Sequence, residues 1–243
     1  MRGERLRSHL SISNQRSTIN NESKITNHQS RMICRALTSA SLRSAARDLA
    51  ARDSDLARVL KRVGYPPIWG RRPGFASLVR IILEQQVSLR SADAMYRRLD
   101  ARLGGVTPHA FARAGIAGLR QLGVTRQKAA YLHGLATRLV DGTLDLSAVS
   151  KAADETGRRT LLDIPGLGPW SVDIYYLMAL RRPDIWPRGD LALATALRDL
   201  KGLRALPSHE QQLEFATKWA PWRSVAARIL WALYLSERRR VVD

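Results

Sequence analysis

Apolar residues along most of the chain recur at helical spacing. From about residue 41 onward, short segments with this period are separated by Gly and Pro, and no β-branched run alternates as it would in a strand. The pattern predicts an all-α protein, a bundle with helices at 41–63, 75–87, 90–103, 108–121, 125–140, 154–163, 170–182, 190–200, 208–219 and 221–237.

The segment 75–87 differs from the other predicted helices because it is apolar on most of its sides. A surface helix keeps a polar face, whereas a helix that is apolar all round is buried. We therefore expect this segment at the centre of the bundle, through Phe75, Leu78, Val79, Ile81, Ile82 and Leu83.

The first 40 residues have a different composition. Sixteen are Ser, Thr, Asn or Gln, seven are basic, two are acidic, and no hydrophobic period persists. Such a segment cannot bury enough apolar surface to fold, so we interpret 1–40 as a disordered basic tail and 41–243 as the folded domain. A mitochondrial transit peptide and an over-extended start codon are the two alternatives.

The charge balance is strongly positive. The 243 residues carry 40 Lys and Arg against 21 Asp and Glu, a formal net charge of +19, which is typical of a protein that binds a polyanion. Nucleic acid is the first candidate. A membrane surface is not favoured, since the cations are spread along the chain and no apolar run of 18 residues occurs.

The single cysteine, Cys34, excludes a disulfide framework within the chain and any site that needs four thiolates. The five histidines have no metal-ligand spacing. Without an apolar leader segment, we expect a cytoplasmic protein associated with the nucleoid.

Residues 161–173 read LLDIPGLGPWSVD and place a Pro-Gly-x-Gly turn between two helical patterns. Pro165 and Gly166 end one helix, and Gly168 with Pro169 begins the next, because Pro suits the first turn of a helix. The glycines lack a Cβ, so backbone N–H groups there can approach a phosphate oxygen. The segment therefore predicts a helix–hairpin–helix that holds DNA without reading its sequence. An ordinary corner between two helices would look similar.

Asp190 stands immediately before the helical pattern LALATALRDL, 22 residues after Gly168. Its position is that of an N-cap, where a carboxylate accepts the first free N–H groups and is favoured in its charged form. A charged, partly desolvated carboxylate can also stabilise positive charge that develops in a reaction. Both roles are compatible in one residue.

Four blocks together resemble the base-excision DNA glycosylase superfamily, and in particular its 3-methyladenine glycosylase II branch. They are LLDIPGLGPWSVDIYYLMAL with WPRGDLALATAL, then FASLVRIILEQQVSLRSA, LRQLGVTRQKAAYLHGLA and KWAPWRSVAARILWALY. The resemblance covers roughly residues 60–237. It implies a cleft between two helical subdomains, roughly 75–165 and 41–74 with 166–243.

The resemblance implies a role for several single residues. Asp190 matches the catalytic carboxylate, which stabilises an oxocarbenium-like sugar while a flipped, damaged base leaves. Trp170, Trp231 and, with less support, Tyr175 are the candidate walls of the base pocket, where aromatic faces attract alkylated cationic purines. Ile174 stands where the family has a tyrosine.

Further matches concern the DNA. Gln86, or its neighbour Gln85, corresponds to the wedge that fills the gap left by the flipped base; a helix-capping amide is the alternative. Backbone carbonyls of Leu162, Ile164 and Leu167 match those that bind a monovalent cation, Na⁺ or K⁺, and no other cofactor is expected. The candidate DNA contacts are Pro165, Gly166, Gly168, Arg126, Lys128 and Arg223.

The position of the Schiff-base lysine in the lyase branch, two residues beyond the second hairpin glycine, is Trp170 here. Without that amine no imine forms, so the resemblance implies a monofunctional glycosylase acting on double-stranded DNA, expected as a monomer. Its expected substrates are 3-methyladenine and 7-methylguanine. Two alternatives remain: a non-catalytic DNA-binding protein with the same hairpin, and a glycosylase for hypoxanthine, etheno adducts or uracil.

Overall fold

The computed structural model describes residues 36–242, and side chains up to residue 238. The predicted tail 1–35 with Cys34 lies outside the described residues. The described part contains helices and no strand, which confirms the all-α prediction. The helices are α2 (Ser39–Arg52), α3 (Ser54–Val63), α4 (Phe75–Glu84), α5 (Leu89–Leu103), α6 (Pro108–Gln121), α7 (Arg126–Val140), α8 (Leu146–Lys151), α9 (Asp154–Leu162), α10 (Pro169–Ile174), the π-helix η1 (Tyr175–Ala179), α11 (Leu191–Lys201), α12 (His209–Thr217) and α13 (Arg223–Val242).

The folded part begins before residue 41. Leu37 is 2% exposed, and its backbone N–H donates to the carbonyl of Arg181 at 2.8 Å. Thr38 caps α2 by accepting from the N–H of Ser41. The prediction that residues 37–40 belong to a disordered tail is therefore wrong. A single buried leucine within a polar stretch gives no periodic signal, which is why the pattern missed it.

The predicted helix 41–63 is two helices that meet at Asp53. Its Oδ1 accepts from the N–H groups of Asp55 and Leu56 at 2.9 and 3.0 Å, so it caps α3 while its own N–H closes α2. Its Oδ2 accepts from the indole Nε1 of Trp219 at 2.8 Å. An aspartate that favours an N-cap over a helix interior explains the break. The short helix α8 was likewise not predicted.

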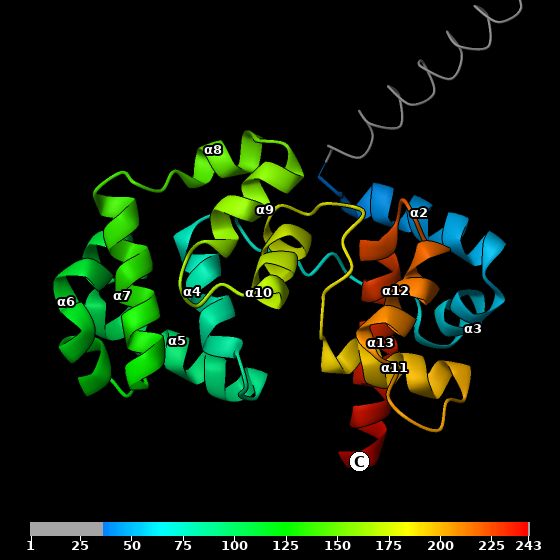
Figure 1. Cartoon of the computed structure of the whole chain (residues 1–243). Coiled ribbons are helices and arrows are strands. Elements are labelled where there is room, and N and C mark those ends of the chain that lie inside the picture. The colour runs from blue at the N-terminus through cyan, green and yellow to red at the C-terminus, as the bar shows by residue number, and fades with distance from the viewer. Residues whose placement is uncertain (1–35, 243) are drawn as a thin grey trace, which may run out of the picture. The chain divides into compact units, whose positions relative to one another are not determined.

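Helix α4 is the central element, as its apolar pattern predicted. Seven of its ten residues are buried, and it packs against α5, α7, α10 and η1. Helices α6 and α7 lie side by side beyond it (Figure 1). Helix α13 packs against α2, α3, α11 and α12 (Figure 1). The buried apolar side chains of all these helices form one continuous core.

The predicted helix 170–182 changes its winding after Ile174. The N–H of Leu180 donates to the carbonyl of Tyr175 at 3.0 Å, five residues back, so residues 175–179 form a π-turn. Such turns occur mostly as single insertions in helices and often near functional sites. Both α10 and η1 pack against α4, and α10 also against α9. The hairpin's second helix therefore packs with elements of 75–165, although the expected division grouped it with the later residues.

Candidate active site and DNA contacts

The hairpin between α9 and α10 forms at the Pro-Gly-Leu-Gly-Pro segment. Leu167 and Ile164 are 2% and 4% exposed and fasten the turn to the core. The N–H of Leu167 donates to the carbonyl of Ile164 at 3.0 Å, which closes the turn. Pro169 is the first residue of α10, as the sequence predicted. The helix–hairpin–helix is therefore present in the fold.

Glycine stands at positions 166 and 168 for two different structural reasons. Gly166 has φ +92°, and a Cβ there would lie 2.8 Å from Cβ of Tyr131 and closer still to its ring. Gly168 has φ −79°, and nothing lies within 4 Å of the position of its Cβ. Gly166 is thus required by packing inside the protein. Gly168 leaves an open space beside the start of α10, which suits the approach of a phosphate.

Gln85 and Gln86 end α4 in opposite ways. The side-chain amide of Gln85 donates to the carbonyl of Gly166 at 2.8 Å and to Oγ of Ser171 at 2.9 Å. Gln86 is exposed and has φ +57°, a left-handed conformation that is uncommon outside glycine. The two neighbours are therefore distinguished by geometry, with Gln85 fastened to the hairpin and Gln86 presented to solvent.

Lys128 on α7 holds the end of α4 from the other side. Its Nζ donates to the carbonyls of Leu83 and Gln85, both at 2.8 Å, and partial burial lowers the pKa of its ammonium. Arg223 forms a two-pronged ion pair with Asp184, with N–O distances of 2.8 and 2.7 Å. Both cations were predicted to contact phosphate. Both have protein partners in this structure, and their phosphate contacts stay predictions. Arg126 is exposed at the start of α7 and keeps that prediction open.

The carboxylate of Asp190 accepts hydrogen bonds from residues of three helices, α10, α11 and α13. It is 8% exposed and caps α11, with its Oδ1 accepting from the N–H of Leu193 at 2.9 Å. The same Oδ1 accepts from the indole Nε1 of Trp231 at 3.1 Å, and Oδ2 accepts from the indole Nε1 of Trp170 at 3.0 Å. Three N–H donors thus orient one carboxylate, and Oδ2 retains the larger share of free lone pairs.

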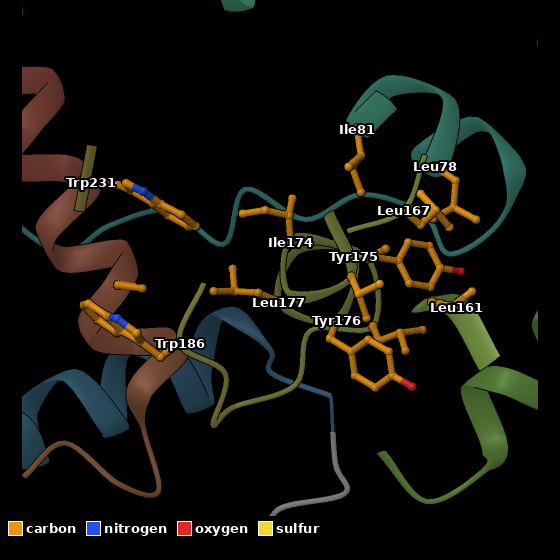
Figure 2. Close-up of a cluster of buried hydrophobic side chains, with 14 of the residues drawn as sticks. Leu78, Ile81, Leu161, Leu167, Ile174, Tyr175, Tyr176, Leu177, Trp186 and Trp231 are labelled. Carbon is orange, nitrogen blue, oxygen red and sulfur yellow. The ribbon is translucent and has the colours of Figure 1, made fainter. Parts of the chain in front are cut away.

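The side chains of Ile174 and of η1 point to two different sides. Figure 2 shows Ile174 and Leu177 pointing towards Trp231, while Tyr175 and Tyr176 point away from it towards Leu161 and Leu167. The hydroxyl of Tyr175 accepts from the N–H of Gly74 at 3.0 Å, and burial raises the pKa of this phenol. The assignment of Tyr175 to a base pocket is therefore wrong. It is a core residue.

The sequence reasoning missed a buried acid in α10. Asp173 is 1% exposed, forms an ion pair with Arg158 of α9, and accepts at Oδ2 from the backbone N–H of Arg188 at 2.9 Å. It thereby ties the loop that leads to Asp190 to the hairpin helices. An acid among the apolar residues of WSVDIYYL was the available signal, since buried carboxylates normally have partners.

Neither a metal centre nor a membrane-spanning helix has a candidate in the part of the chain that the structure describes. No group of three His, Cys, Asp or Glu residues there could hold a metal ion. Among the same residues, no helix is both long and apolar enough to span a membrane.

Comparisons with known proteins agree with this geometry. A family model described as "HhH-GPD superfamily base excision DNA repair protein" matches residues 79–221. DNA-3-methyladenine glycosylase 1 of Schizosaccharomyces pombe is 26% identical over 198 residues, which cover 79% of this chain and 87% of that protein. The chain spans about half the length of several bacterial relatives, such as 56% of one from Bacillus subtilis and 40% of one from Mycobacterium tuberculosis.

Solved structures give the same assignment. The S. pombe 3-methyladenine DNA glycosylase in complex with abasic DNA has a TM-score of 0.71 at 26% identity, over 77% of this chain and 95% of that chain. The DNA-3-methyladenine glycosidase of Bacillus halodurans has a TM-score of 0.64 at 30% identity, over 76% and 87% of the two chains. The chain belongs to the HhH-GPD superfamily of base excision DNA repair proteins.

Proposed function

We propose that this chain is a monofunctional DNA glycosylase that removes alkylated purines, 3-methyladenine and 7-methylguanine, from double-stranded DNA. The observation that carries the proposal is the carboxylate of Asp190, desolvated and held by the indoles of Trp170 and Trp231. The relatives reported above are named for 3-methyladenine and support the same substrate class.

The chemistry follows from the charges. The bond between C1′ of the sugar and N9 of the purine breaks, its electron pair leaves with the base, and the sugar becomes an oxocarbenium-like cation. At about 4 Å and an effective dielectric near 20, a carboxylate stabilises such a cation by about 4 kcal/mol. Water then adds to C1′, and its proton passes to Oδ2 of Asp190 or to solvent.

The two tryptophans would serve two functions in this reaction. Their indole N–H groups orient Asp190, and their ring faces can stack on a purine that carries a formal positive charge. Cation–π attraction contributes roughly 0.5–2 kcal/mol at such a site. Because the charged purine is already a good leaving group, the site can discriminate by reactivity rather than by shape.

The absence of a lyase step is part of the proposal. The position that holds the Schiff-base lysine in the lyase branch is Trp170, whose indole is bonded to Asp190. Lys128 has its amine engaged by two backbone carbonyls. A side chain without a nucleophilic amine at this position cannot form an imine with the sugar, so β-elimination of the strand is not expected.

The hairpin would hold the DNA backbone. Gly168 leaves open space at the start of α10, where a phosphate would approach the helix N-terminus. Carbonyls of Leu162, Ile164 and Leu167 would hold Na⁺ or K⁺, a hard cation that prefers oxygen ligands. When bound, the ion would supply positive charge for a phosphate.

The test is base release from methylated duplex DNA by the purified chain, with free 3-methyladenine and 7-methylguanine measured by chromatography. Asp190→Asn should abolish release while DNA binding persists. Asp199→Asn, on the same helix and exposed, is the matched control and should retain wild-type rates. Release by Asp190→Asn at the wild-type rate would overturn the assignment.

A parallel assay on an end-labelled oligonucleotide separates the alternatives. Strand breaks that appear only after alkali indicate base removal alone, whereas breaks without alkali indicate a lyase. Binding of DNA without release of any methylated purine favours a non-catalytic DNA-binding protein. Release of hypoxanthine, ethenoadenine or uracil in place of methylated purines moves the activity to another lesion.

A further inference from the structure

Asp173 joins three segments around the site. Its carboxylate forms an ion pair with Arg158 of α9, and it accepts the backbone N–H of Arg188, which lies in the loop between η1 and α11. Asp173 itself belongs to α10. The loop is therefore fastened to both helices of the hairpin at residue 188.

The loop is fastened a second time two residues later. Asp190 accepts the N–H of Leu193 and the two indole N–H groups, which fixes the backbone at the start of α11. Only Gly189, with φ +70°, lies between these two points. The Cα atoms of Arg188 and Asp190 are consequently within about 7 Å of each other, the span of two extended residues.

The side chain of Arg188 is unpaired in the part of the chain that the structure describes. Its guanidinium makes no hydrogen bond or ion pair within residues 36–238, and the residue is exposed. Two arginines that contact the loop or its anchor are paired: Arg158 with Asp173, and Arg223 with Asp184. A backbone held by a buried carboxylate thus carries an unpaired guanidinium, two residues before the candidate catalytic group in the sequence.

This placement fits the geometry of a substrate at Asp190. In the proposed reaction C1′ of the flipped nucleotide faces the carboxylate, and the 5′ and 3′ phosphates of that nucleotide lie one sugar away. The long side chain of Arg188, two residues from Asp190, can extend from the backbone towards one of these phosphates. A guanidinium can bind a phosphate through two parallel hydrogen bonds, which fixes orientation as well as charge.

We propose that Arg188 binds a phosphate that flanks the flipped nucleotide, and that Asp173 positions it. The inference rests on the proposed function in that Asp190 marks where the nucleotide lies. Arg188 would hold the extruded sugar against the carboxylate, whereas the hairpin holds the backbone of the duplex. Asp173 is a positioning residue because it acts through the backbone of Arg188.

The experiment measures binding to a duplex with a tetrahydrofuran abasic analogue by fluorescence anisotropy, at KCl concentrations from 50 to 300 mM. Each phosphate contact contributes about 0.9 to the slope of log K against log salt, which is about eightfold in affinity at 0.1 M. Arg188→Gln should lower the slope by about 1 and weaken binding about eightfold. Arg188→Lys keeps the charge and should keep most of the slope.

Arg43→Gln is the matched control, since Arg43 is exposed on α2, which packs against α3 and α13 rather than the hairpin. It should change neither quantity beyond twofold. Thermal unfolding of each variant verifies that the fold is intact. A slope for Arg188→Gln equal to wild type, or an equal loss in Arg43→Gln, would overturn the proposal.

Asp173 is tested by a different readout. Asp173→Asn leaves the charge of Arg188 in place, so the salt slope should stay at wild type while single-turnover excision falls about tenfold. A fall in the slope instead would contradict a positioning role. Failure of the proposed function gives a different result from failure of the Arg188 proposal. In that case the wild-type protein would release no methylated base, while its binding to the abasic duplex would still have a salt slope that depends on Arg188.

Discussion

The indole of Trp231 donates its N–H to Oδ1 of Asp190 at 3.1 Å, from a helix 41 residues away in sequence. Trp170 donates to the other oxygen at 3.0 Å, so α10 and α13 both contribute to the orientation of one carboxylate at the start of α11. The sequence suggested these tryptophans as base-pocket walls through their ring faces. The structure shows that their N–H groups bind the carboxylate of Asp190, and this role can be tested separately from the predicted pocket role.

Trp231→Phe and Trp170→Phe keep an aromatic ring and remove the N–H donor. A hydrogen bond to a charged group contributes about 1.5–3 kcal/mol. If the loss falls on the transition state, each variant should excise methylated purines at least about tenfold more slowly, since about 1.4 kcal/mol is one factor of ten. Single-turnover rates on 7-methylguanine DNA measure the effect.

Trp219→Phe is the control for that experiment. Its indole donates to Oδ2 of Asp53 at 2.8 Å, the same type of bond at a distance from the site, and its side chain is 1% exposed. It should lower the free energy of unfolding by a similar amount and leave the excision rate unchanged. Equal rates for all three variants would show that the indole N–H groups have only a structural role.

Alanine at the two hairpin glycines should have opposite effects, a loss of stability at one position and a loss of DNA affinity at the other. Gly166→Ala puts a Cβ against Tyr131 and forces a left-handed residue, which costs about 1–2 kcal/mol before the clash is counted. It should lower Tm by several degrees. Gly168→Ala meets nothing within 4 Å, so its Tm should stay near wild type while DNA affinity falls.

Calorimetry and anisotropy on the same two proteins check this pair. The expected result is that Gly166→Ala loses stability and Gly168→Ala loses DNA affinity. A Gly168→Ala protein that binds abasic duplex as tightly as wild type would mean that no phosphate approaches this turn.

Local signals explain how much the sequence could predict. The Pro-Gly-Leu-Gly-Pro turn, the N-cap at Asp190 and the apolar α4 each depend on residues close together in sequence, and the structure contains all three. The position of Tyr175 and the protein partners of Lys128 and Arg223 depend on residues that lie far away in the sequence. The hydroxyl of Tyr175 accepts from the N–H of Gly74, two carbonyls accept from Lys128, and Asp184 forms an ion pair with Arg223. Helical periodicity carries none of this information.

Gln86 and Gln85 can be distinguished by stability and base flipping. Gln86→Ala removes an exposed side chain at φ +57°, so the free energy of unfolding should change by less than about 0.5 kcal/mol. Loss of a wedge should nevertheless slow excision and lower the fluorescence rise of 2-aminopurine placed beside the lesion. Gln86→Gly should add stability, because glycine relieves the left-handed strain.

Gln85→Ala removes the donor to the carbonyl of Gly166 and to Oγ of Ser171, and leaves two part-buried acceptors without this partner. It should cost about 1–3 kcal/mol of stability. The wedge assignment would move to Gln85 if Gln86→Ala excised at the wild-type rate and the stability-corrected loss appeared only at position 85.

The buried phenol of Tyr176 should make the folded protein less stable at alkaline pH. Burial, helped by the negative charge of Asp154, raises the pKa of Tyr176 to about 12 from the ordinary value of 10.0. The folded state therefore holds this proton more tightly than the unfolded state does. Its contribution to stability is fully present below pH 10 and is lost as the pH rises through 12, by up to about 3 kcal/mol.

Tyr176→Phe removes that titration and a hydroxyl that has no hydrogen-bond partner within the described residues. Because no bond is lost, the variant should match or exceed wild-type stability at pH 7. Between pH 10 and 12 its urea midpoint should fall less steeply than that of wild type. Tyr65→Phe, at a tyrosine that is 50% exposed, serves as the control and should follow the wild-type curve. Parallel curves for wild type and Tyr176→Phe would mean that the phenol ionises in the folded protein as readily as in water.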